Sequence, residues 1–144
     1  MFMPDYFELY ELLPRTVYRE HQNTPYKLWG MFDDRFLKTI HSLRKRYGKM
    51  IMNDWYWGGQ WNERGWRPWN TLTGAIFSQH KWGRAGDLIP FDHSAEEIRQ
   101  DILHDPFHPD FKYITCVEMN VSWLHIDCRN RDKKKNGILI IYPT

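Results

Sequence analysis

The chain contains little cysteine, with only Cys116 and Cys128 among its 144 residues. Two cysteines are too few for the disulfide framework of a small secreted domain, so we expect both thiols to be free and buried. A long apolar run is also missing, because Asp5, Glu8 and Glu11 interrupt the N-terminal stretch MFMPDYFELYELL and no basic region precedes it. We therefore expect this stretch to be neither a signal peptide nor a membrane span, and the protein to be made in a cytoplasm.

The chain has no large excess of charge of one sign. Its net charge is +2 and it has no long basic or acidic block, which argues against a dedicated nucleic-acid binder. Hydrophobic residues make up 42% and charged residues 26%, as in ordinary soluble domains. We expect one domain over residues 1–144, a monomer that binds neither nucleic acid nor a membrane.

Aromatic residues, by contrast, are abundant at 17%, with 8 tryptophans. Five of these lie between Asn53 and Asn70, in NDWYWGGQWNERGWRPWN, among glycines, asparagines and arginines. So many rings in such polar company are hard to bury together. We expect some of them in the core and others along a cleft, where Arg64 or Arg67 contacts a ligand.

Apolar periodicity predicts an α+β fold with a small antiparallel sheet and helices packed on one side. Helices are expected at 5–13, 33–48 and 94–105, the last beginning with a capping box of Ser94 and Glu97. Residues 14–32 are expected to be irregular, because Pro14 and Pro25 interrupt them.

Short strands are expected in the second half of the chain and before the tryptophan-rich segment. They are predicted at 49–55, 86–91, 113–119, 121–129 and 137–143. The lysines of the polar segment NRDKKKNG, before the last strand, are expected to form the solvated tip of a turn.

Two of the 7 histidines differ from the others in context. His80 lies in FSQHKWGRAGDLI, seven residues before Asp87, and His125 lies in the middle of the predicted strand SWLHID. Gly83 and Gly86 permit a positive φ or a close backbone approach, so the chain can aim His80 and Asp87 at one point. The remaining five histidines have surface or helix-start contexts. For His125 alone, a structural core histidine is the alternative interpretation.

A strand carrying Asp87 beside a strand carrying His125 would complete a set of three ligands. Two imidazoles and one carboxylate, with a further position open for water, suit a catalytic zinc ion, which lowers the pKa of that water toward neutrality. The spacing therefore indicates a zinc site at His80, Asp87 and His125.

The segment SQHKWGRAGD, Ser78 to Asp87, matches all five fixed positions of the signature Ser-x-His-x-x-Gly-x-Ala-x-Asp. In this the chain resembles the zinc D-alanyl-D-alanine peptidases, a family that includes carboxypeptidases and phage endolysin peptidases and has a hedgehog-like fold. SWLHID resembles the family's C-terminal Trp-x-His segment, and ERGWR resembles its arginine-containing segment. The resemblance extends from about Met50 to Arg129.

The resemblance implies a zinc peptidase that acts on the D-amino-acid stem peptides of peptidoglycan. It implies that His80, Asp87 and His125 are the zinc ligands. It also implies that Arg67 holds a substrate carboxylate or a developing oxyanion, and that Ser78 helps to position the substrate.

One position departs from the family pattern. Many members carry the catalytic glutamate three residues before the last histidine, where this chain has Ser122. Glu118, on the preceding predicted strand, is the candidate proton shuttle, with an exposed strand residue as the alternative interpretation. Asp127 is a second candidate, because alternation directs it to the same face as His125, where it would also be able to orient that ligand.

Two hypotheses from different functional classes follow. The first is a phage-derived zinc metallopeptidase, either a carboxypeptidase or an endopeptidase, made in the host cytoplasm and acting at the bacterial cell wall. The second is an inactive zinc-binding member of the fold that serves as a virion or ligand-binding component. The peptidase is the first hypothesis, and the displaced glutamate and the lack of a separate wall-binding domain add weight to the second.

Overall fold

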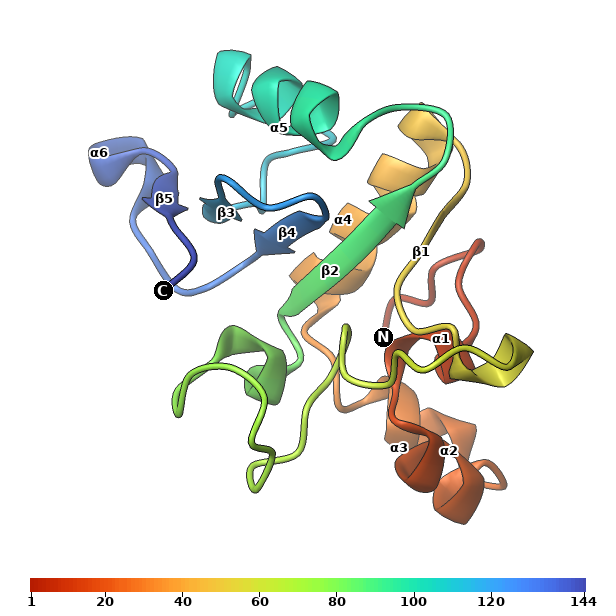
Figure 1. Cartoon of the computed structure of the whole chain (residues 1–144). Coiled ribbons are helices and arrows are strands. Elements are labelled where there is room, and N and C mark those ends of the chain that lie inside the picture. The colour runs from red at the N-terminus through yellow and green to blue at the C-terminus, as the bar shows by residue number, and fades with distance from the viewer.

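The computed structural model describes all 144 residues as an α+β fold around a five-stranded sheet of order β1-β2-β4-β3-β5. The strands are β1 (Met50–Ile51), β2 (Ala85–Pro90), β3 (Cys116–Glu118), β4 (Leu124–Asp127) and β5 (Leu139–Ile141). Figure 1 shows β2 running through the middle of the molecule with β4 beside it. The α+β class predicted from the sequence is confirmed.

The sheet is mixed rather than purely antiparallel, which corrects the prediction. The pairs β1–β2, β2–β4 and β3–β4 are antiparallel, but β5 pairs with β3 in parallel. After β4 the chain forms α6 (Lys133–Asn136) and continues to the far side of β3. A hairpin between β4 and the last strand does not form, because β2 and β3 already occupy both edges of β4.

The two long helices lie where the sequence predicts them. They are α4 (Asp34–Tyr47) and α5 (Ala95–His104). At their N-termini the Asp33 carboxylate accepts from the backbone N–H of Arg35, and Ser94 Oγ accepts from that of Glu97. Side-chain acceptors of this kind satisfy N–H groups that have no partner within the helix.

The N-terminal third is more helical than predicted. It contains α1 (Leu9–Leu12), α2 (Arg15–His21) and α3 (Pro25–Trp29), so the irregular segment expected over residues 14–32 is wrong. Pro14 caps α2 and Pro25 is the first residue of α3. Proline is tolerated at a helix start, because its missing N–H would have no intrahelical partner there. The strand expected at 49–55 is reduced to β1.

The lysine run is not only a solvated tip, which is a further correction. Lys133 is buried, and its ammonium group donates to the carbonyl oxygens of Pro106, Phe111 and Lys112. Lys134 and Lys135 are exposed, as the sequence predicts. α6 therefore ties the loop before β3 to the end of the sheet.

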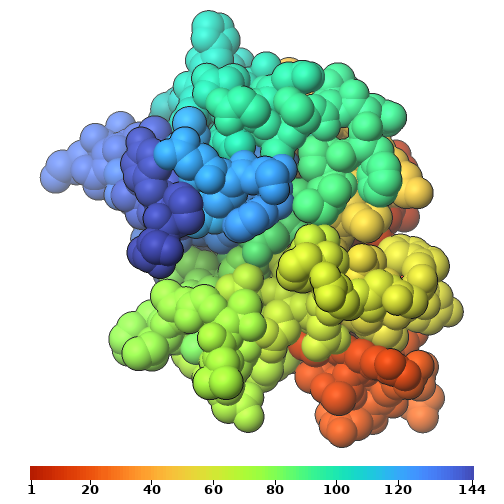
Figure 2. All heavy atoms as spheres, viewed as in Figure 1, coloured from red at the N-terminus to blue at the C-terminus, as the bar shows by residue number.

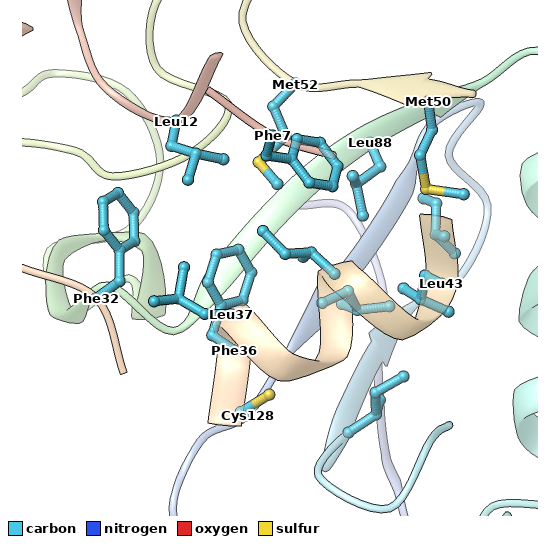
Figure 3. Close-up of a cluster of buried hydrophobic side chains, with 14 of the residues drawn as sticks. Phe7, Leu12, Phe32, Phe36, Leu37, Leu43, Met50, Met52, Leu88 and Cys128 are labelled. Atoms are coloured by element: carbon cyan, nitrogen blue, oxygen red, sulfur yellow. The ribbon is translucent and has the colours of Figure 1, made fainter. Parts of the chain in front are cut away.

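One face of the sheet packs on a single cluster of 24 buried residues. Leu88, Leu124 and Ile126 reach this cluster from β2 and β4, and α4 and α5 both contribute to it. Figure 3 shows Phe36 of α4 within this cluster, near Met52 and Leu88. The large helices thus share one side of the sheet, and the other face of β2 and β4 is available for a polar site.

Both cysteines are free and buried, as predicted, and Cys128 belongs to the core cluster. None of the helices is long and apolar enough to cross a bilayer.

Candidate metal centre

The pairing of β2 with β4 brings two of the three predicted ligands, Asp87 and His125, together. Asp87 lies directly opposite His125, and their neighbours Leu88 and Leu124 form the next pair. Because side chains alternate along a strand, Asp87 and His125 point away from the core on the same face. His125 Nδ1 lies 2.8 Å from Asp87 Oδ1.

His80 reaches the same point from a short 3-10 helix, η2 (Gln79–Trp82), that precedes β2. Ser78 caps this turn, with Oγ accepting from the backbone N–H of His80 at 3.3 Å. Gly83 ends the turn at φ 69, where a Cβ atom would lie 2.1 Å from the carbonyl oxygen of Met31. Only glycine fits this position, and the turn sets His80 Nε2 at 3.4 Å from Asp87 Oδ2.

The second glycine of the motif, Gly86, permits a close approach between the backbone and another segment. Gly86 faces the core, where a Cβ atom would lie 2.9 Å from the Phe36 ring. Its missing side chain lets α4 pack closely behind the strand that carries Asp87.

The three side chains form a buried group whose potential ligand atoms lie within 4.8 Å of one another. Each imidazole has its other nitrogen beside an oxygen acceptor: His80 Nδ1 is 2.8 Å from the Gly65 carbonyl oxygen, and His125 Nε2 is 3.0 Å from Asp127 Oδ2. Metal-binding histidines are characteristically oriented in this way. His80 Nε2, the Asp87 carboxylate and His125 Nδ1 are thus positioned so that they could hold a metal ion.

Burial and mutual contact set the charges of this group. Burial lowers the pKa of His80, which favours the neutral, ligating form. Burial alone would raise the pKa of Asp87, but the nearby His80 and His125 outweigh it and lower that pKa. Burial would likewise lower the pKa of His125, but hydrogen bonds to Asp127 and Asp87 raise it to about 9. With both ring nitrogens protonated, His125 would lie between two carboxylates, and metal binding at Nδ1 would require the loss of the proton on that nitrogen.

A second group, Cys116, His125 and Asp127, also has its potential ligand atoms within 4.8 Å. However, the Asp127 carboxylate already accepts from Arg129 Nε at 2.8 Å and from Nη2 at 2.7 Å. Burial raises the pKa of Cys116, which keeps the thiol protonated. This group is therefore the weaker metal site, and Asp127 orients His125 from behind.

Two cavities meet at the candidate metal centre. The first, of about 420 Å³, is lined among others by His80, Asp87, His125 and Glu118. The second, of about 440 Å³, is lined by residues 60–64 of the tryptophan-rich segment. Arg67, Thr73, Asp87 and Trp123 line both cavities, which together form one groove, called here the long groove. Figure 2 shows the face on which the yellow-green loop segments meet the blue C-terminal ones.

The other predicted site residues lie in the long groove. Arg67 is buried, and its guanidinium donates to Asp87 Oδ2 at 3.1 Å and to the Glu63 carbonyl oxygen at 2.6 Å. Ser78 and Glu118 line the first cavity, and the half-buried Glu118 carboxylate makes no hydrogen bond to another group. Ser122, three residues before His125, is exposed.

The tryptophans divide between core and cleft, as predicted. Trp55 is buried, and its Nε1 donates to the Leu13 carbonyl oxygen, whereas Trp61 lines the second cavity. Sequence reasoning missed Thr73 and Trp123 as groove residues. Trp123 precedes His125 by two positions, and this spacing is the signal that could have indicated it.

No protein-family model matches the chain, and no curated protein or solved structure shows significant similarity to it.

Proposed function

We propose that the protein is a zinc-dependent peptidase of hedgehog-like fold that hydrolyses D-amino-acid-containing peptide bonds of peptidoglycan. The observation that supports this most is the meeting of His80, Asp87 and His125, with each imidazole oriented by an oxygen acceptor. The match of Ser78 to Asp87 with the peptidase signature supports the same assignment. A phage origin and action at the bacterial cell wall fit this activity.

The donor set favours zinc over the common alternatives. Calcium and magnesium prefer sites made of oxygen ligands, whereas two imidazoles and one carboxylate suit zinc. Three protein ligands are typical of catalytic zinc, which lowers the pKa of its bound water and polarises a carbonyl group.

The surrounding residues have separate tasks in this proposal. Glu118 takes the proton of the attacking water and passes it to the leaving amine. Arg67, beside Asp87, stabilises negative charge that develops on the substrate. Ser78 positions the substrate and caps η2, and Asp127 holds His125 in the ligating orientation.

Metal analysis and a digestion assay test this function together. The purified protein should contain about one zinc per chain, as a single three-ligand site requires. Incubated with peptidoglycan, it should release new amino groups or free D-alanine. A protein that holds the metal but cleaves nothing would instead be the ligand-binding member of the fold. The absence of any bound divalent metal would refute both.

A further inference from the structure

Three arginines line the long groove, and they differ in what they bind. Arg67 donates to Asp87, and the guanidinium of Arg129 makes two hydrogen bonds to Asp127. Arg64 has no carboxylate partner: its guanidinium reaches only the Met52 carbonyl oxygen, at 3.5 Å. Arg64 is thus the only groove arginine whose charge no carboxylate contacts directly.

Arg64 is held in place despite having no such partner. Its backbone N–H donates to Asn53 Oδ1 at 2.8 Å, and its carbonyl oxygen accepts from the Asp87 N–H at 2.8 Å. Its guanidinium carbon lies 4.0 Å from the centre of the Trp61 ring. Stacking on an aromatic face restricts an arginine but leaves the edge of its guanidinium free to donate.

The acidic groups near Arg64 do not take up its hydrogen-bonding capacity. The charges that act on Arg64 are those of Asp54 and Asp87. Asp54 accepts from the backbone N–H of Trp61 at 2.8 Å, and Asp87 belongs to the metal group. Glu63 also lines this cavity, but its carboxylate accepts from the Thr71 hydroxyl at 2.6 Å.

We propose that Arg64, stacked on Trp61, binds a carboxylate group of the substrate in the second cavity of the long groove. This inference rests on the proposed peptidase function and specifies its substrate. The bound carboxylate would lie in the second cavity, which Arg64, Arg67 and Asp87 line. Glu118 lines only the first cavity. The substrate then extends past the metal centre into both cavities.

The carboxylate has two possible sources, and they distinguish two reactions. A C-terminal α-carboxylate at Arg64 makes the protein a carboxypeptidase, which removes the last residue. A carboxylate attached along a longer peptide, such as the free α-carboxylate of a γ-linked D-glutamate, makes it an endopeptidase. Both sources offer the planar, two-oxygen group that a guanidinium binds best.

Paired probes separate these sources in a binding experiment with the zinc-loaded protein. The first pair is N-acetyl-D-alanyl-D-alanine as its free acid and as its amide. The second is a C-terminally amidated stem peptide with either D-isoglutamate or D-isoglutamine. Tryptophan fluorescence just after rapid mixing reports binding, because Trp61 and Trp123 line the second cavity.

In one of the two pairs the carboxylate form should bind about 10- to 100-fold more tightly than its amide. Arg64→Gln should bring that ratio close to one. Arg64→Lys should give an intermediate ratio, because lysine keeps the charge but loses the two-pronged geometry. Lys134→Gln, which removes an exposed charge on α6, should keep the parent ratio.

Equal binding of acid and amide in both pairs would overturn the inference, as would an unchanged ratio in Arg64→Gln. Cleavage of peptidoglycan by the parent protein is scored separately. If the parent discriminates between the probes but cleaves nothing, the carboxylate site stands and the peptidase proposal fails. If the parent cleaves peptidoglycan but binds acid and amide probes equally, the peptidase proposal stands and the carboxylate site at Arg64 fails.

Discussion

The two faces of β2 and β4 are held together by different forces. On the core face, Leu88, Leu124 and Ile126 are fully buried in the hydrophobic cluster, and their contribution scales with the apolar area removed from water. On the opposite face, Asp87 and His125 are buried as well, but they are held by directional hydrogen bonds between groups of opposite charge. Residues one position apart therefore serve stability on one face and the candidate metal centre on the other.

This difference means that stability and metal binding should respond to different substitutions. A core side chain can be replaced by another of similar size, because packing depends on volume and shape. A ligand cannot be replaced in this way, because the loss of one nitrogen or oxygen removes a bond and leaves its partner unpaired in a buried site.

The largest expected effect is on the polar face. His125→Ala should lose the bound metal and lower peptidoglycan hydrolysis by about 10³-fold or more, because charge stabilisation by the metal is worth several kcal/mol. Elemental analysis and release of amino groups measure the two losses. Ser122→Ala, an exposed change on the loop before β4, should retain both metal and activity. Full metal content in His125→Ala would remove His125 from the ligand set.

The matching change on the core face is Leu124→Ala, one residue away. It should lower the free energy of unfolding by about 3 kcal/mol, because it leaves a cavity in a closely packed cluster. Denaturant unfolding of the metal-free protein measures this loss. The folded variant should still bind one metal ion per chain. Loss of metal from the folded variant would show that the two faces cannot be separated.

Glu118→Gln tests the proton shuttle without removing a ligand. It preserves size and hydrogen bonding but removes the base, so hydrolysis should fall by about 10²-fold while metal content is unchanged. Initial rates of amino-group release, together with metal analysis, give both quantities. A variant as fast as the parent would rule Glu118 out as the base. Asp127 would not replace it, because Asp127 is fully buried behind His125 and its carboxylate is held by Arg129.

Asp127→Asn should have a smaller effect on metal binding. The change weakens the hydrogen bond that orients His125, and metal affinity should fall by about 10- to 100-fold. Competition with a chelator of known affinity measures this change. Asp110→Asn, in an ion pair with Arg46 elsewhere on the molecule, is the matched control and should leave affinity unaltered. If both variants bind the metal as tightly as the parent, Asp127 does not orient His125 for metal binding and serves only as the partner of Arg129.

The smallest expected effect concerns the contact between β2 and α4 on the core face. Gly86→Ala would bring a methyl group to 2.9 Å from the Phe36 ring and should cost about 1–2 kcal/mol of unfolding free energy. In a Phe36→Leu background the same change should cost less, because the ring is gone. A double-mutant cycle of unfolding free energies measures this coupling. Simple additivity would mean that Phe36 is not what requires a glycine.

The candidate site could be anticipated where its geometry is local or periodic. Ser78 and Gly83 close a short turn, so the distance from His80 to Asp87 depends on a few neighbouring residues. Strand alternation is also local, and it was enough to assign Asp127 to the same face as His125. The pairing of β2 with β4 was the one long-range assumption, and the structure confirms it.

The predictions were wrong where the structural environment of a residue depends on segments far away in the sequence. The sequence predicts interruptions at Pro14 and Pro25, whereas Pro14 is the N-cap residue of α2 and Pro25 is the first residue of α3. Sequence alone does not distinguish a helix start from an interruption. The sequence predicts a solvated Lys133, whereas its ammonium group donates to three carbonyl groups of the loop before β3. Burial of that kind is visible only once both segments are positioned.

The sequence by itself determined the capped helices α4 and α5, the glycine turn at His80 and the alternation that separates ligands from core residues. These depend on hydrogen bonds and sterics within a few residues. Only the tertiary structure decided that β5 pairs with β3, that Arg67 contacts Asp87, and that Arg64 has no carboxylate partner in the groove. Each of these depends on which segments compete for a strand edge or a charge, and that competition is settled only when the whole chain packs.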